Sequence, residues 1–190
     1  MIVPARFLIA ALMLGLAAGC ATLKDVPRRA DPFEFMGRVL VHSSGAAVTA
    51  NTRWVHTADT DELWLLTPTG QAVAQMREDG TGATITGIDQ VVYRGTSVES
   101  LSKRALGWEL PLSRMQYWVR GAPAPGLPAD IKERDAAGKV RVMLQDGWTV
   151  SYEHYAADRF QGLPRRMEIS GATQSIRLVI DTWGRDETAP

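Results

Sequence analysis

The sequence predicts a mainly β fold: an antiparallel sheet or barrel of about eleven short strands, interrupted once by helices. Apolar and polar residues alternate over many short runs, as expected when only one face of a strand is buried. Gly, Pro, Asp and Asn separate these runs at short intervals and mark turns. Between the sixth and seventh runs the apolar spacing changes to that of a helix.

The first half is expected to hold six strands, over residues 35–42, 48–56, 62–67, 71–77, 83–86 and 90–94. The alternation places on one face Phe35, Gly37, Val39 and Val41 of the first strand and Val48, Ala50 and Trp54 of the second. Turns are expected at Ser43-Ser44-Gly45, Pro68-Thr69-Gly70 and Asp79-Gly80. These turns are short enough for antiparallel hairpins.

Two helices are expected next. Val98, Leu101, Ala105 and Leu106 have near-helical spacing, and so do Leu112, Met115, Trp118 and Val119. Pro111 suits the start of the second helix, and Gly121 suits its end. Five further strands are expected over 130–134, 139–144, 148–154, 165–170 and 175–183.

The N-terminal residues have the pattern of an export signal. Arg6 precedes an apolar run over 7–18, which at about 12 residues is too short to span a bilayer. The run ends in Leu16-Ala17-Ala18-Gly19-Cys20, which resembles the lipobox of bacterial lipoproteins. We therefore expect a signal peptide over 1–19, a lipid on Cys20, a flexible tether over 20–32 and one domain over 33–190. The alternative is an ordinary signal peptide with a leftover cysteine.

The residue after the cysteine and the charge balance bear on location and partners. In lipoproteins of this kind an aspartate after the cysteine favours the inner membrane, and Ala21 here favours the periplasmic face of the outer membrane. The chain has 21 basic and 21 acidic residues and no basic block, so nucleic-acid binding is not expected. Cys20 is the only cysteine, which excludes a disulfide within the chain and a cysteine-based metal site.

Residues that could carry chemistry are scattered. His42, His56 and His154 lie on expected strands without metal-ligand spacing, as surface or half-buried residues. Asp59 and Asp61 fall in an expected turn, where aspartate is favoured for backbone reasons. No nucleophile-turn or phosphate-binding motif is present. We expect no enzyme activity, no metal and no cofactor.

The tryptophans leave two interpretations open. Six are present, at Trp54, Trp64, Trp108, Trp118, Trp148 and Trp183. They could fill an ordinary core. Alternatively, a curved sheet with helices across one face can leave an apolar interior that suits an acyl chain.

Several segments, taken in order, resemble the LolB family of outer-membrane lipoproteins. They are the lipobox at Cys20, Gly37-Arg38, Trp54, the run 65–70 (LLTPTG), the run 115–123 (MQYWVRGAP), the run 146–152 (DGWTVSY), Leu163-Pro164, Leu178-Val179-Ile180 and Trp183. The resemblance covers essentially the whole chain. It implies an unclosed eleven-stranded antiparallel barrel with a helical lid over a hydrophobic cavity. It also implies a monomer that accepts the acyl chains of lipoproteins from the periplasmic carrier LolA and inserts them into the outer membrane.

Candidate residues follow from that resemblance and from the strand faces. Those expected to line the cavity are Trp54, Leu66, Met76, Leu101, Met115, Trp118, Trp148, Val150, Met167, Ile169, Leu178 and Ile180. The alternation shows which residues share a face, but not which face is concave. The expected insertion loop is Pro68-Thr69-Gly70, where the family commonly carries an exposed leucine and this chain has Thr69. Replacing Thr69 by leucine is expected to preserve or raise insertion without changing acceptance.

Other functions stay open at this point. The same half-barrel could hold or sense lipid without transferring it. A structural lipoprotein of an envelope complex, with a packed interior, is a further alternative, and an esterase is the last. An open apolar space beneath the helices would favour the two lipid functions over the structural one.

Overall fold

The computed structural model describes residues 29–155 and 162–184. The predicted signal peptide, Cys20 and most of the tether lie outside these residues. Within them, no helix is both long enough and apolar enough to cross a bilayer.

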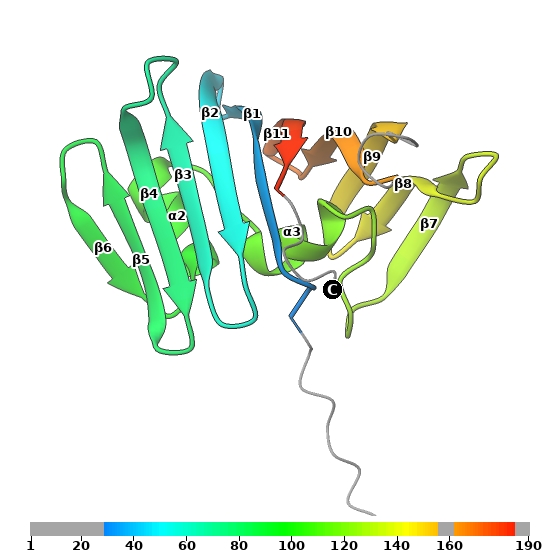
Figure 1. Ribbon diagram of the computed structural model, residues 1–190, viewed down its shortest axis with the longest axis horizontal. Coiled ribbons are helices and arrows are strands. Elements are labelled where there is room, and N and C mark those ends of the chain that lie inside the picture. Colours follow the sequence, from blue (N-terminus) through cyan, green and yellow to red (C-terminus); the bar gives the residue numbers. More distant parts are fainter. Residues whose placement is uncertain (1–28, 156–161, 185–190) are drawn as a thin grey trace, which may run out of the picture.

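The fold is a single antiparallel sheet of eleven strands that curves around two helices (Figure 1). The strands are β1 (Phe33–Ser43), β2 (Ala46–His56), β3 (Asp61–Leu66), β4 (Ala72–Asp79), β5 (Gly82–Gly87), β6 (Val92–Gly95), β7 (Ala129–Arg134), β8 (Val140–Gln145), β9 (Trp148–Tyr155), β10 (Pro164–Ser170) and β11 (Gln174–Trp183). Their order in the sheet is β6-β5-β4-β3-β2-β1-β11-β10-β9-β8-β7. Because β6 and β7 are free edges, the barrel is unclosed, and the predicted fold class is confirmed.

The two halves of the sheet meet where β1 pairs with β11. This pairing joins residues that are far apart in the sequence, such as Val39 and Leu178. Its register shifts between Met36 and Gly37. A Cβ atom on Gly37 would overlap the carbonyl oxygen of Val179, so the close approach of the strands requires glycine.

The helices α2 (Val98–Leu106) and α3 (Leu112–Trp118) form the lid predicted from the change in period. Helix α2 packs on β4, β5 and β6, and α3 continues toward the other half of the sheet (Figure 1). Leu101 and Met115 face the sheet and are almost fully buried. The lid therefore closes the concave side of the sheet.

Buried and exposed residues alternate along the strands, as the period of two requires. The face of β1 that carries Phe35 and Val41 is the buried, concave one. Val48, which pairs with the buried Val41 and shares this face, is 43% exposed, because β3 pairs with β2 only over Asn51–His56 and does not reach Val48.

Candidate functional site

Most of the residues predicted to line a cavity share the concave side of the molecule. At most 8% of the surface of any of them is exposed, and they belong to one continuous cluster that joins the sheet to both helices. They are Trp54, Met76, Leu101, Met115, Trp118, Trp148, Val150, Met167, Ile169, Leu178 and Ile180. The structure brings these residues together from both halves of the sheet and from the lid.

Leu66 does not belong to this group. Strand β3 begins with Asp61 facing inward, so its buried residues are Asp61, Leu63 and Leu65. Leu66 lies on the outer face, so Leu65 and not Leu66 is the interior residue. The sequence suggests an apolar strand at this point, but its consecutive leucines do not reveal the inward one.

The apolar interior also includes residues outside the predicted set, among them Phe35, Leu63, Met143 and Ile176. Their alternation was the signal that could have identified them. The interior is closed in this structure, since the side chains of the sheet and the lid contact one another across it. An acyl chain could enter only if the lid moved and these side chains repacked.

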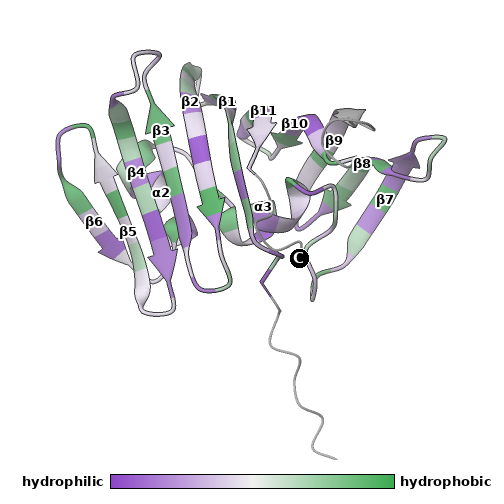
Figure 2. Ribbon diagram, viewed as in Figure 1, coloured by the Kyte–Doolittle hydropathy of each residue, from purple (hydrophilic) through white to green (hydrophobic). Residues whose placement is uncertain are grey.

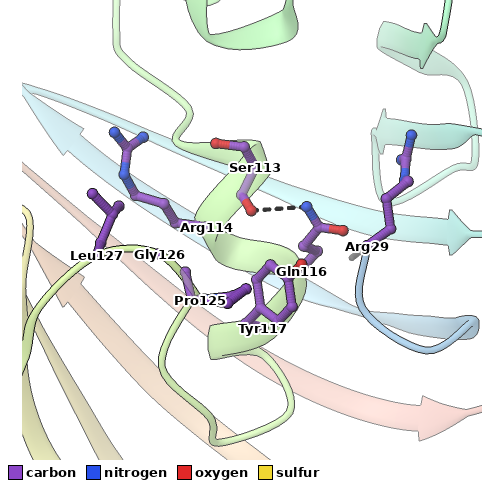
Figure 3. A pocket seen from close by; sticks show the side chains of 9 residues that line it. Arg29, Ser113, Arg114, Gln116, Tyr117, Pro125, Gly126 and Leu127 are labelled. Carbon is purple, nitrogen blue, oxygen red and sulfur yellow. Dashed lines mark hydrogen bonds between the residues drawn. The ribbon is translucent and has the colours of Figure 1, made fainter. Parts of the chain in front are cut away.

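A surface cavity of about 340 Å³ lies beside α3 (Figure 3). Its lining comes from three parts of the chain: Arg29, the α3 residues Ser113, Arg114, Gln116 and Tyr117, and residues 124–127. Arg114 forms an ion pair with Asp146, and Arg29 forms one with Asp61. The cavity thus marks the seam at which α3 meets the segment at Arg29 and residues 124–127, with two ion pairs at its margins.

Helix α2 is fixed at both ends by local contacts. Ser97 accepts a hydrogen bond from the backbone of Ser100, whose side chain in turn contacts the backbone of Ser97. Gly107 ends the helix at φ +82°, a conformation that glycine adopts readily. At the first turn, a carboxylate oxygen of Glu78 accepts a hydrogen bond from the Val98 amide at 2.6 Å. Burial raises the pKa of Glu78 above its ordinary value, although this hydrogen bond opposes the rise.

The end of α3 is fixed by polar side chains of β8 and β9. Gln145 is 1% exposed, and its Oε1 accepts hydrogen bonds from Trp118 Nε1 at 2.7 Å and from the Ala124 amide at 2.9 Å. Its Nε2 donates to the carbonyl oxygens of Ala124 and Leu127 at 2.8 and 3.1 Å. The hydroxyl of Tyr152 donates to the Trp118 carbonyl oxygen at 2.7 Å. No pattern in the sequence suggested this role for Gln145.

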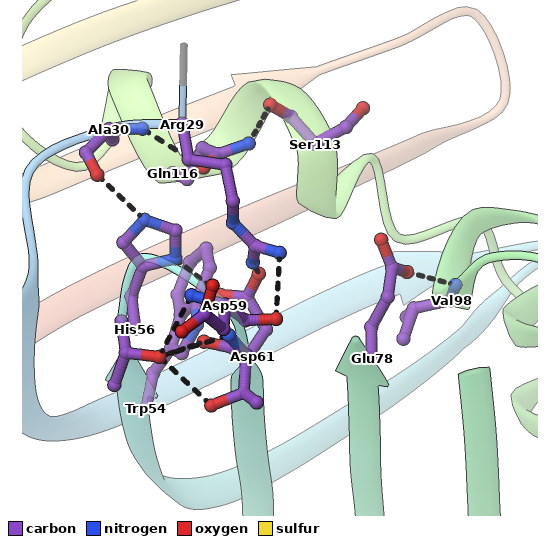
Figure 4. Close-up of polar contacts among 12 residues, drawn as sticks. Arg29, Ala30, Trp54, His56, Asp59, Asp61, Glu78, Val98, Ser113 and Gln116 are labelled. Atoms are coloured by element: carbon purple, nitrogen blue, oxygen red, sulfur yellow. Dashed lines mark hydrogen bonds and ion pairs between the residues drawn. The ribbon is translucent and has the colours of Figure 1, made fainter. Parts of the chain in front are cut away.

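The middle of α3 is connected to β2 and β3 through a buried polar network (Figure 4). The Asp61 carboxylate accepts a hydrogen bond from Trp54 Nε1 at 2.7 Å, lies 2.7 Å from His56 Nδ1, and pairs with Arg29. His56 Nε2 lies 3.0 Å from the Ala30 carbonyl oxygen. The Ala30 amide donates to Gln116 Oε1 of α3 at 3.2 Å.

This network corrects two predictions. His56 was expected at the surface or half-buried, but it is 1% exposed because the segment at Ala30 covers it. Asp61 was expected to serve a turn, but it is the buried acceptor at the centre of the network. In the described ranges, 29–155 and 162–184, no three His, Cys, Asp or Glu residues are grouped as metal ligands.

The predicted insertion loop, Pro68-Thr69-Gly70, is the exposed tip of the β3–β4 hairpin. The hydroxyl groups of Thr67 and Thr69 lie 2.9 Å apart, and the Gly70 amide donates to the Thr67 carbonyl oxygen at 2.9 Å. Gly70 has φ +85°, which closes the turn. The tip is thus a compact polar turn without an apolar side chain of its own beyond the proline.

Comparisons with known proteins agree with this architecture. The family model for the outer membrane lipoprotein LolB matches residues 31–183. The outer-membrane lipoprotein LolB of Nitrosomonas europaea is 37% identical over 155 residues, which cover 80% of this chain and 73% of that protein. The LolB of Azoarcus sp. (strain BH72) is 34% identical over 189 residues, covering 95% of this chain and 97% of that protein.

Among solved structures, a LolA superfamily protein from Nitrosomonas europaea has a similar fold. Its TM-score is 0.50 at 9% sequence identity, and the match covers 84% of this chain and 88% of that one. Such low identity bears on the fold alone. The family match over nearly the whole described domain, together with relatives of similar length, shows that this chain belongs to the LolB family of outer-membrane lipoproteins.

Proposed function

We propose that this protein, as a monomer at the periplasmic face of the outer membrane, accepts the acyl chains of lipoproteins from a LolA-like carrier and releases them into that membrane. Membership of the LolB family supports a role in lipoprotein localisation. The observation that carries the finer proposal is the continuous apolar interior, which lies beneath a lid attached at its margins by polar side chains.

The physical need for such a protein is large. A triacylated cysteine exposes on the order of 45 methylenes, and at about 0.8 kcal/mol each their transfer into water costs roughly 35 kcal/mol. The acyl chains must therefore pass from one apolar interior to another. The transfer proceeds down an affinity gradient, in which each 1.4 kcal/mol gives about a tenfold bias.

Uptake requires the lid to separate from the sheet. The polar contacts of α3 suit this movement. When the lid separates, water replaces the lost partners, so breaking each hydrogen bond has a net cost of only about 0.5–1.5 kcal/mol. The apolar side chains that now contact one another would contact the acyl chains instead. The interior thus exchanges one set of apolar contacts for another.

The direct test is transfer from the carrier. The protein without its signal peptide is mixed with a carrier that holds a labelled lipoprotein, and the label is followed to the protein and then to vesicles. We expect the label to leave the carrier and reach the vesicles only when this protein is present. If the protein takes up no label, the transfer function is wrong.

The site of uptake can be tested separately with brominated acyl chains, which quench the tryptophans they contact. We expect the brominated chains to quench the tryptophan fluorescence of the wild-type protein. The quenching should be smaller in Trp118→Phe, because Trp118 is fully buried under the lid. The matched control is Trp64→Phe, since Trp64 lies on the outer face of β3 beneath the guanidinium of Arg53. Equal losses in both variants would contradict binding in the interior.

A structural role in an envelope complex is the second candidate, and the closed interior is the observation that favours it. A protein with that role would give neither transfer nor quenching. Lipid storage without transfer would give quenching alone. The two experiments together therefore separate the three functions.

A further inference from the structure

Exposed apolar side chains gather at the β5–β6 hairpin. Ile88 is 70% exposed, Val91 45% and Val92 41%, and no large apolar side chain in the described part of the chain is more exposed than Ile88. Single exposed apolar residues are ordinary on a protein surface. Here the three lie within residues 88–92 and form one local apolar patch.

The turn that carries this patch is held by its own hydrogen bonds. The Gly87 amide donates to the Val91 carbonyl oxygen at 3.1 Å, and the Gln90 amide donates to the Gly87 carbonyl oxygen at 3.0 Å. A carboxylate oxygen of Asp89 accepts from the Val91 amide at 3.1 Å. The apolar side chains therefore project from a defined turn, and the one carboxylate beside them is bonded to the backbone.

In the half of the sheet formed by β1 to β6, the patch lies at the edge made by one set of strand ends, and the turns of this edge are nearly free of charge. The β1–β2, β3–β4 and β5–β6 turns share this edge, which is uppermost in Figure 1, because successive strands alternate in direction. Among residues 43–46, 67–72 and 87–92, Asp89 is the only charged one. The opposite edge carries Asp59 and Asp79. In Figure 2 the upper end of β6 is hydrophobic and its lower end hydrophilic.

We propose that this edge contacts the phospholipid bilayer, with Ile88 entering the boundary between headgroups and acyl chains. The proposal rests on the proposed function, since release requires the protein to meet the membrane. A bilayer deforms around a protruding aliphatic side chain, whereas a protein partner would need a matching recess. Charged groups are strongly disfavoured within a bilayer, and this edge carries almost none.

The β3–β4 turn on the same edge is polar at Thr69, so it offers little apolar surface for this contact. The β5–β6 turn supplies what that turn lacks. Two strands, β4 and β5, separate the turns, which corresponds to about 10 Å at the usual strand spacing. Both turns can therefore meet one membrane surface together, the first through polar groups and the second through Ile88.

The contact can be tested on the full lipidated chain in phosphatidylcholine vesicles. Cys20 is the only cysteine and its thiol is expected to carry lipid, so Ile88→Cys offers a single site for an environment-sensitive fluorophore. The matched control is Thr81→Cys, in the β4–β5 turn on the opposite edge. We expect lipid-borne nitroxides to quench the label at 88, and aqueous iodide to quench the label at 81. Equal iodide quenching at both positions would overturn the proposal.

A functional arm separates this proposal from the transfer function. Ile88→Ser is expected to slow release into vesicles roughly tenfold, because the burial of one large aliphatic side chain is lost. Acceptance from the carrier should be unchanged. Ile88→Leu, which keeps a large aliphatic side chain, should release cargo at the wild-type rate. A fall in acceptance instead would mark the turn as a protein-docking site and overturn the proposal. Failure of the wild type to accept cargo would sink the transfer function, while the fluorescence result would still decide the membrane contact.

The bilayer contact should also be independent of lipid charge. The edge carries no cation among residues 43–46, 67–72 and 87–92, so anionic lipid has no group there to attract. We expect the label at 88 to respond alike in neutral and anionic vesicles. A strict requirement for anionic lipid would contradict the proposed contact.

Discussion

The two helices of the lid are attached to the sheet in different ways. Helix α2 has a capping box at Ser97, ends at Gly107, and packs on β4, β5 and β6. Helix α3 is shorter, follows Pro111 without a side-chain cap, and depends on buried hydrogen bonds to residues distant in the sequence, such as Gln145. From this difference we expect α2 to stay on the sheet. We expect α3 to be the part that moves.

The largest effect is expected at the end of α3. Gln145→Leu would leave Trp118 Nε1 and the backbone groups of Ala124 buried without partners, and should lower the free energy of unfolding by about 3 kcal/mol. Urea denaturation measures this, and hydrogen exchange should rise in α3 far more than in α2. The control is Gln174→Leu, whose amide bonds the backbone of Glu109 at the surface. Equal acceleration of exchange in both helices would contradict the distinction between them.

The second effect is expected in the network that joins α3 to β2 and β3. Asp61→Asn removes the charge that pairs with the partly exposed Arg29, and should lower the free energy of unfolding by about 2 kcal/mol. Asp59→Asn is the control, because Asp59 is exposed and should change stability by less than about 0.5 kcal/mol. Thermal unfolding of the two variants gives the comparison. Similar losses would mean that the network does not hold the lid.

A smaller effect is expected from the cap of α2. Ser97→Ala removes the acceptor for the Ser100 amide and should cost about 1 kcal/mol. Ser113→Ala in α3 is the control, since the described contacts of Ser113 are made by its backbone. If α2 depends on its cap and α3 does not, only the first variant lowers the midpoint of denaturation. Equal shifts of the denaturation midpoint in both variants would show that the two helices do not differ in their dependence on a cap.

The smallest effect is expected at Glu78, where the pH is the probe. Its pKa is raised on folding, so its ionised form is less favourable in the folded state than in the unfolded one. The folded state is therefore destabilised as the pH rises above the unfolded value near 4.5, and the cost is complete above the folded pKa. Glu78→Gln keeps an oxygen for the Val98 amide and should remove this fall in stability. A fall of the same size in the variant would show that another group causes it.

Much of the fold could be predicted because its signals are local. The alternation in each short run and the turn residues between runs identified the strands, and the change of period between 94 and 130 identified both helices. The alternation also grouped most interior residues correctly. It failed at Leu66, because a run of consecutive apolar residues has no period from which to tell the inner face.

The roles of His56, Asp61 and Gln145 could not be predicted for a different reason. Each depends on a segment far along the chain: His56 on Ala30, Asp61 on Arg29, and Gln145 on Trp118. A polar residue in a short strand has the same local pattern whether its partner is water or a buried amide. Burial of these side chains is a property of the assembled lid and sheet.

The sequence by itself determined how many strands form, where they turn, which residues share a face, and which family the chain resembles. All of these depend on neighbouring residues or on short motifs. Tertiary structure decided which face became concave, how α3 is held, and that Ile88 is exposed at the same edge as the polar Thr69 turn. These features depend on the pairing of β1 with β11 and on the covering of one face by the lid, which no local pattern specifies.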